Sequence, residues 1–273
     1  MAKARKKSPD EMSFLDHLEE LRWLLVRSTV AVLIMATAIF FVSDYIFDVI
    51  IFGPTSPDFI TYRSFCDLSH YLGFADSICV TDMPFIIQNT DMEGQVNMLV
   101  WICITGGFIL GFPYLLWELW KFIRPALYER ERKNAKLFIS IASILFFLGV
   151  LFGYFVIVPM SVNFVATFKV SDVVKNQFTL DSYIGMIKTS LIASGLFFEL
   201  PIIIYFLTKM GLVTPEFLRK YWKYAVVLIL IVAAIVTPPD VVSQIIVAIP
   251  MLMIYEMSIY ISKVVTRKKL KNG

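Results

Sequence analysis

Six stretches of the chain are almost continuously apolar, and polar connections separate them. The first three, residues 23–43, 96–117 and 137–159, are long enough as helices to cross about 30 Å of hydrocarbon. The fourth, residues 189–207, is also long enough but carries an acidic residue near its middle. The pattern predicts an all-α membrane protein with six transmembrane helices.

The last two apolar stretches are short. Residues 224–236 would form about 20 Å of helix, and residues 241–262 are interrupted by Glu256. The connection 237–240 reads Thr-Pro-Pro-Asp, which cannot continue a helix because proline lacks the backbone donor. We therefore expect a short helical hairpin that thins the bilayer locally or lies below one face.

Positive charge indicates how the helices are oriented. Of the 25 Lys and Arg residues, 21 lie near the two termini, in the second-to-third connection or in the fourth-to-fifth connection. Since loops rich in Lys and Arg stay in the cytoplasm, both termini are predicted to be cytoplasmic. The remaining four are Arg63, Lys169, Lys175 and Lys188.

These assignments divide the chain into three parts. Residues 1–22 are predicted to form a cytoplasmic tail and an amphipathic interfacial helix, and residues 263–273 a basic cytoplasmic tail. Between them, residues 23–262 form the membrane domain, with a long outer loop at 44–95. The basic start is expected to be retained, because the apolar stretch after it is too long for a signal peptide.

The composition agrees with a membrane protein and argues against an enzyme. Hydrophobic residues make up 58% of the chain, and the charged share of 17% is below the roughly one quarter of soluble domains. The sequence contains no GxSxG, P-loop or HExxH motif. Its two histidines, His17 and His70, are predicted to lie on opposite sides of the membrane, so we expect no catalytic centre, metal or cofactor.

Two of the three cysteines share the outer loop. Cys66 and Cys79 would face an oxidising compartment there, which favours a disulfide, although two separate thiols remain the alternative. Cys103 lies in an apolar run and is predicted to be a small core residue.

Acidic residues near the cytoplasmic ends are candidates for binding. Glu19 and Glu20 lie on the polar side of the amphipathic helix, where they are either solvated charges paired with Arg22 or part of a site. Glu131 lies in the second-to-third connection among many basic residues, so ordinary loop ion pairs are the alternative there.

Glu199 is a different kind of candidate, since it lies inside the fourth apolar stretch. An ionisable side chain at that depth costs roughly 2.5–3.5 kcal/mol on insertion scales. Pro201 follows two residues later and loosens the helix. Glu199 is therefore either a functional acid or a protonated one that is hydrogen-bonded within the bundle.

Several stretches together resemble the TatC family, a subunit of the twin-arginine protein translocase. Each stretch alone is weak, but their order on a chain with six apolar segments is specific. The resemblance covers about residues 14–261. The matching stretches are residues 17–22 (HLEELR), 122–132 (FIRPALYERER), 198–201 (FELP), 237–244 (TPPDVVSQ) and 248–251 (AIPM).

The resemblance implies a receptor and scaffold for signal peptides that carry two adjacent arginines. Such a protein helps to export folded proteins across the bacterial cytoplasmic membrane, and the resemblance implies that the proton motive force drives this export. Glu20 and Glu131 are implied to bind the arginine pair, because guanidinium groups form strong, often bidentate bonds with carboxylates. Arg22 and Phe122 match family positions that shape this site.

The resemblance also implies partners and a shape for the bundle. Glu199 matches a buried acid on the concave side of a cupped bundle, and Pro201 matches as well. Asp240 and Gln244 match an outer hairpin that is implied to dock single-span partners of the TatA/TatB type, either two proteins or one. Self-association is implied and nucleic-acid binding is not. The long outer loop and its cysteines depart from the family pattern.

Two other function classes fit the sequence less well. A proton-coupled secondary transporter with Glu199 as relay predicts a continuous polar pathway and an internal repeat, and the sequence contains neither. An intramembrane enzyme would need a nucleophile beside a base, and no such pair is evident.

Overall fold

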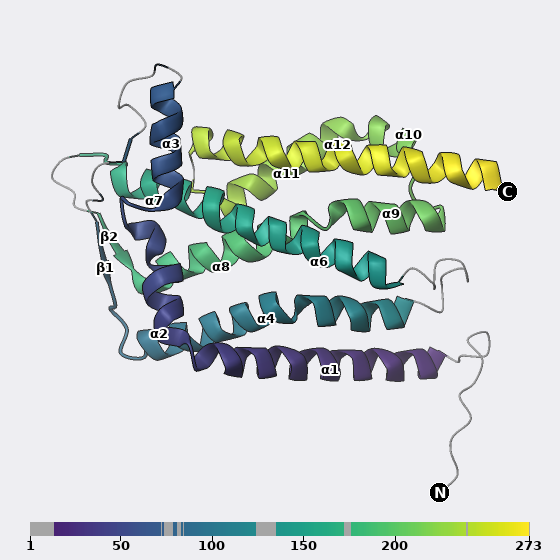
Figure 1. The fold of residues 1–273 in the computed structure, drawn as a ribbon, viewed down its shortest axis with the longest axis horizontal. Helices are drawn as coiled ribbons and strands as arrows, with labels where there is room; N and C mark the ends of the chain where they lie inside the picture. Colours follow the sequence, from purple (N-terminus) through teal and green to yellow (C-terminus); the bar gives the residue numbers. More distant parts are fainter. Residues whose placement is uncertain are drawn as a thin grey trace, which may run out of the picture. The chain divides into compact units, whose positions relative to one another are not determined.

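Helices make up nearly all of the described part of the chain (Figure 1). The chain divides into two compact units, one formed by residues 1–41 and 103–144 and the other by residues 42–102 and 145–273. The computed structural model describes residues 14–71, 73, 79–80, 83, 85–123, 135–171, 176–238 and 240–272.

The first unit is built on helix α1 (Phe14–Phe40) and the second part of helix α4 (Gly94–Ile123), which lie side by side (Figure 1). A Cβ atom at Gly107 would lie 2.7 Å from both the carbonyl oxygen of Val32 and the nitrogen of Ala36. Backbone atoms cannot yield, so only glycine permits this approach. Helix α1 contains no Gly or Pro, and no break separates the predicted interfacial helix from the first span.

The second unit contains most of the other long helices. Helix α6 (Ala135–Phe152) continues through the π-helical turn η6 (Gly153–Ile157) into α7 (Val158–Thr167). Helix α8 (Leu180–Phe197) is followed by α9 (Leu200–Met210) after a two-residue turn. Both long apolar segments are therefore interrupted helices, which is typical of membrane spans whose neighbours can satisfy the freed backbone groups.

The C-terminal part is a helical hairpin, as predicted, preceded by the short helix α10 (Pro215–Lys220). Only its first helix is short: the second has 32 residues, so the prediction of a short sixth helix is wrong. Helix α11 (Trp222–Val236) ends before Pro238, helix α12 (Val241–Asn272) begins after Asp240, and α12 packs against α9 and α11. Helix α12 runs on to residue 272, so the basic segment from residue 263 onward is helical, and its assignment as a cytoplasmic tail stays a prediction. Buried apolar residues of this core include Ile204, Leu218, Ile229, Ala233, Val247 and Met251.

Among the described residues, five helical segments are long and apolar enough to cross a membrane. A sixth apolar helix, Trp222–Val236, is shorter, as its 15 residues give about 22 Å of rise. The five longer segments are His17–Phe40, Gly94–Ile123, Lys136–Thr167, Leu180–Met210 and Ser243–Lys268.

The predicted outer loop is largely folded. Strand β1 (Ile86–Gln88) pairs in parallel with β2 (Gln177–Thr179), with Ile87 opposite Phe178. The helical pieces that precede β1 are α2 (Ser43–Tyr45), the π-helical η2 (Ile46–Ile51), the 3₁₀ turn η3 (Gly53–Thr55) and α3 (Ile60–Tyr71).

Side-chain hydroxyls satisfy carbonyls that the π-helical segments leave free. Tyr154 donates to the carbonyl of Ile50 at 2.8 Å, and Tyr183 donates to that of Ile51 at 2.7 Å. Thr61 donates to the carbonyl of Phe155 in η6 at 2.6 Å. The two tyrosine bonds join η2 to η6 and to α8, and the threonine bond joins α3 to η6. The segment before β1 is thereby attached to the long helices through backbone carbonyls of π-helical turns.

Tyr62 makes a further bond of this type between α3 and its neighbours. Its hydroxyl donates to the carbonyl of Pro54 at 2.9 Å and lies 3.0 Å from that of Pro159. The side chain is buried, and burial raises the pKa of the Tyr62 phenol well above its usual range. The hydroxyl therefore stays protonated and remains a donor.

Changing Tyr62→Phe should destabilise the protein by about 1–3 kcal/mol, because two carbonyls lose their shared donor in a buried place. The measurement is the thermal unfolding midpoint of the purified protein in detergent. Tyr71→Phe is the matched control, since Tyr71 on the same helix is 88% exposed. Equal midpoints for the two variants would contradict this account.

Candidate functional site

The cytoplasmic ends predicted for the first two spans meet through one aromatic contact. The ring of His17, on α1, stacks on that of Phe122, on α4, with centroids 4.3 Å apart and planes inclined by 24°. Glu20 is exposed one helical turn after His17 and forms no hydrogen bond or ion pair with any described residue. An unpaired carboxylate beside an aromatic platform can accept a guanidinium group.

The other predicted members of this site are less informative. Arg22 and Glu19 are exposed, and neither pairs with a described residue. Whether these charges are only solvated or form part of a site stays a prediction. Glu131 lies outside the described residues, so its place in the site stays a prediction.

A third acidic residue in this unit was missed by the sequence analysis. The side chain of Glu118, on α4, is 3% exposed and accepts from Lys121 at 2.6 Å and from Arg27 of α1 at 3.4 Å. The predicted span ends at residue 117, so Glu118 lies just beyond it and was not among the predicted candidates. The available signal was an acid three residues before a lysine within an otherwise apolar and aromatic helix.

Glu199 lies at the break between α8 and α9. It occupies the residue before α9 begins, and Pro201 at the start of α9 ends the hydrogen-bond ladder of α8. The residue is 6% exposed, and its Oε1 has no hydrogen-bond partner among the described residues. An unsatisfied buried acid is typical of a functional position, and the choice between a functional acid and a protonated one that is hydrogen-bonded within the bundle stays a prediction.

Asp240 and Gln244 both have structural bonds in the α11–α12 hairpin. Asp240 Oδ2 accepts from the backbone nitrogen of Ser243 at 2.8 Å, which caps the start of α12. The side-chain nitrogen of Gln244 donates to the carbonyl of Leu230 on α11 at 3.0 Å. These bonds define the hairpin, and a role in docking partners stays a prediction.

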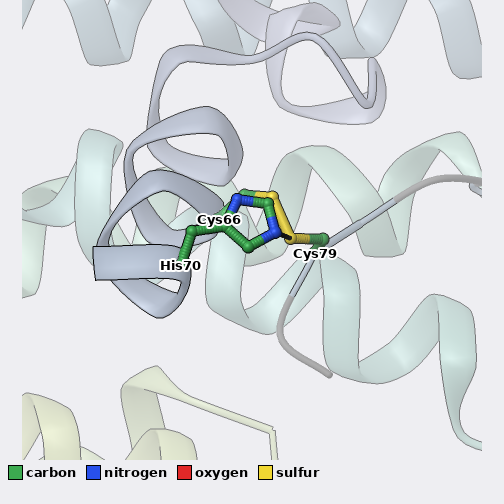
Figure 2. A group of neighbouring side chains, drawn as sticks. All are labelled: Cys66, His70 and Cys79. Carbon is green, nitrogen blue, oxygen red and sulfur yellow. Dashed lines mark hydrogen bonds between the residues drawn. A yellow bond between two sulfur atoms is a disulfide. The ribbon is translucent and has the colours of Figure 1, made fainter. Parts of the chain in front are cut away.

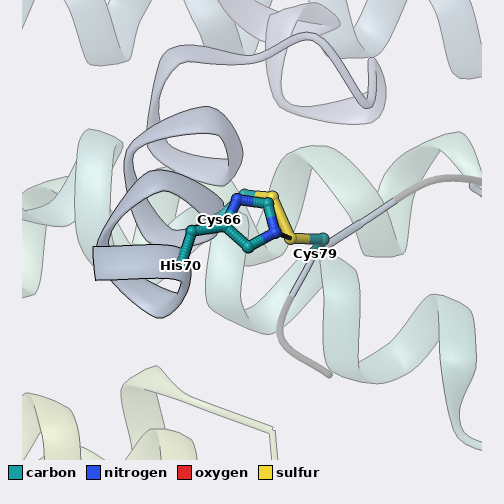
Figure 3. The surroundings of a disulfide bond; sticks show 3 residues. All are labelled: Cys66, His70 and Cys79. Atoms are coloured by element: carbon teal, nitrogen blue, oxygen red, sulfur yellow. Dashed lines mark hydrogen bonds between the residues drawn. A yellow bond between two sulfur atoms is a disulfide. The ribbon is translucent and has the colours of Figure 1, made fainter. Parts of the chain in front are cut away.

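Cys66 and Cys79 are joined by a disulfide, with sulfurs 1.96 Å and Cα atoms 4.6 Å apart (Figure 3). His70 follows Cys66 by one turn of α3, and its Nε2 lies 4.0 Å from the sulfur of Cys79 (Figure 2). All three ligand atoms lie within 4.8 Å of one another, a spacing that could suit a metal ion. Bonded sulfurs are not thiolates, so the oxidised form shown here does not offer that ligand set.

One known protein family matches most of the chain. The sequence model described as Sec-independent protein translocase protein (TatC) matches residues 16–250. The chain belongs to the TatC family.

Several relatives match nearly the whole chain. A Sec-independent protein translocase protein TatC from Blattabacterium is 44% identical over 270 residues, covering 97% of this chain and all of the relative. The TatC protein of Aquifex aeolicus is 32% identical, covering 94% of this chain and 98% of its own. A crystal structure described as the twin arginine translocase receptor TatC is 30% identical, with a TM-score of 0.70 over 92% of this chain and 99% of its own.

As a member of the TatC family, the chain is a component of a protein translocase and not an enzyme. The residues that the structure brings together are those of the α1–α4 end: His17, Glu20 and Phe122, with Glu118 and Arg27 deeper along the same two helices. Glu199 belongs to the other unit.

Replacing Glu199 by an apolar residue should raise the stability of the protein but lower its export activity. Glu199→Met removes a buried carboxyl oxygen without a partner, so the free energy of unfolding should rise by about 1–3 kcal/mol while export of a twin-arginine reporter falls. Thermal unfolding in detergent and an export assay in cells that lack their own TatC measure the two effects. Glu256→Met is the control, because Glu256 is half exposed and paired with Arg219 at 3.3 Å, so no stability gain is expected there. A lower midpoint for Glu199→Met would show that the carboxyl is a stabilising group.

The disulfide predicts a definite pattern of thiol reactivity. In the native protein neither Cys66 nor Cys79 should react with an alkylating agent, and after reduction and unfolding all three cysteines should react, as counted by mass spectrometry. The Cys66→Ser/Cys79→Ser variant should lose up to about 3 kcal/mol of stability, as expected for a loop of this length. Two alkylated outer cysteines in protein prepared without reductant would contradict the bond.

Proposed function

We propose that this chain is the signal-peptide receptor and scaffold of a twin-arginine translocase in the bacterial cytoplasmic membrane. The observation that carries the proposal is Glu20, an exposed carboxylate with no partner among the described residues, next to the stacked rings of His17 and Phe122. A carboxylate that is not already neutralised can take an incoming arginine without first breaking an ion pair. Glu131 would supply the second carboxylate.

The proposed orientation has six spans, with both termini in the cytoplasm. Five long apolar helices and the shorter α11 give an even number of crossings, which leaves both ends on one side. The excess of Lys and Arg near the termini and in the second-to-third and fourth-to-fifth connections assigns that side to the cytoplasm. The shortness of α11 supports a locally thinned bilayer around the hairpin.

Partners of the TatA/TatB type would dock on the hairpin. Large apolar side chains on one face of α11 are exposed in the isolated chain: Leu228 is 61% exposed, Ile231 54% and Ile235 69%. These residues recur at helical spacing, which suits packing against a single-span helix. Asp240 and Gln244 hold the outer end of this face in place through their bonds at the turn. The driving force would be the proton motive force.

The test is binding of a fluorescent twin-arginine signal peptide to the full-length protein in detergent, against the same peptide with both arginines changed to lysine. Wild type should prefer the arginine peptide, and Glu20→Gln should weaken it about tenfold or more, because bonds to charged groups contribute roughly 1.5–3 kcal/mol. Glu131→Gln should have a similar effect. Glu19→Gln is the matched control, an adjacent exposed carboxylate that should change affinity less than about twofold.

Equal binding of the two peptides by wild type would contradict the receptor proposal. In that case a proton-coupled transporter using Glu199 becomes the better hypothesis, and flux of small solutes into proteoliposomes would test it.

A further inference from the structure

Glu118 is an almost fully buried charged residue that the proposed binding site does not use. Its side chain is 3% exposed, while those of its partners Arg27 and Lys121 are 53% and 46% exposed. Burying a carboxylate carries a desolvation penalty that its ion pairs often only offset, so such a group is weak evidence for stability by itself. The arrangement suggests a role in fixing one particular geometry.

The position of Glu118 relates it to the proposed site. On α1, Arg27 follows Glu20 by seven residues, which is two helical turns, so the two side chains share a face. On α4, Phe122 follows Glu118 by four residues and shares its face. Two contacts join these faces: the His17–Phe122 stack at one end and the Arg27–Glu118 pair further along. Glu20 lies on α1 between the two contacts.

We propose that Glu118 is a positioning residue for recognition of the twin-arginine signal, a role that rests on the function proposed above. The ion pair of Glu118 with Arg27 fixes how α1 is positioned along α4. In that position Glu20 of α1 and Phe122 of α4 can contact the same ligand. Glu118 also neutralises and retains the guanidinium of Arg27, which shares a face with Glu20 and would otherwise compete with the signal arginines for that carboxylate. Glu118 itself is too buried to touch the peptide.

The two ion pairs of Glu118 provide an internal control. The bond to Lys121 is the shorter, at 2.6 Å, but it lies within α4 and cannot set the register between helices. The bond to Arg27 is longer, at 3.4 Å, but it crosses from α4 to α1. A role in general stability predicts that losing the shorter bond matters at least as much, whereas positioning predicts that only the longer bond matters.

The experiment measures binding of the arginine and lysine signal peptides to full-length Glu118→Gln, Arg27→Gln and Lys121→Gln variants in detergent. Glu118→Gln and Arg27→Gln should each lower affinity for the arginine peptide about fivefold or more and reduce its preference over the lysine peptide. Lys121→Gln should stay within about twofold of wild type. The charge-swapped variant Arg27→Glu/Glu118→Arg should recover most of the lost preference, which also excludes misfolding as the cause.

Three results would overturn the inference: unchanged preference in Glu118→Gln, a loss in Lys121→Gln as large as that in Arg27→Gln, or no recovery in the charge-swapped variant. Failure of the receptor proposal looks different, because wild type itself would then not distinguish the two peptides. If wild type discriminates and Glu20→Gln weakens binding while Glu118→Gln does not, only the role of Glu118 is wrong.

Discussion

Backbone polar groups inside hydrocarbon have no water to bond with, and most of this structure follows from that constraint. In two irregular stretches, η2 and η6, side-chain hydroxyls donate to backbone carbonyls. Tyr154 and Tyr183 bond the carbonyls at the end of η2, and Thr61 bonds one in η6. The irregular turns are thus the places where the outer segment is attached to the membrane helices, and hydroxyl groups hold it there without adding charge.

The two buried acidic residues Glu118 and Glu199 differ in whether their carboxyl groups have partners. Glu118 is given two cationic partners, one from its own helix and one from α1, so its burial is compensated locally. Glu199 has a buried oxygen with no partner, at a point where Pro201 has already interrupted the helix. The first arrangement suits a fixed structural register. The second leaves a group whose environment can change when a ligand or partner arrives, which is the usual reason that such an acid is kept.

The sequence predicted the helices better than their connections. Apolar length alone located all six apolar helices, because long hydrophobic runs have few alternatives. The sixth is nevertheless a helix of 32 residues and not the short one expected from its interruption by Glu256. It could not predict that β1 and β2 pair, since the partner strands of three residues each lie about 90 positions apart. It placed the end of the second span at residue 117 and so missed Glu118, because the effect of Arg27 on a buried acid depends on the packing of α1 against α4. The basic residues after residue 262 continue α12, since cations are favourable in the last turns of a helix.

The pairing of β1 with β2 constrains the order in which the protein assembles during synthesis. A strand at residues 86–88 can find its partner at 177–179 only after the two spans between them have been made and inserted. Cys66 and Cys79 are only 13 residues apart, so their disulfide does not depend on later spans. It can form while the later helices are still being synthesised. The segment between the first two spans is therefore assembled in two stages, an early local one and a late one that begins only when the residues after the third span have been made. Until then its edge strand is open to any other chain that offers a backbone.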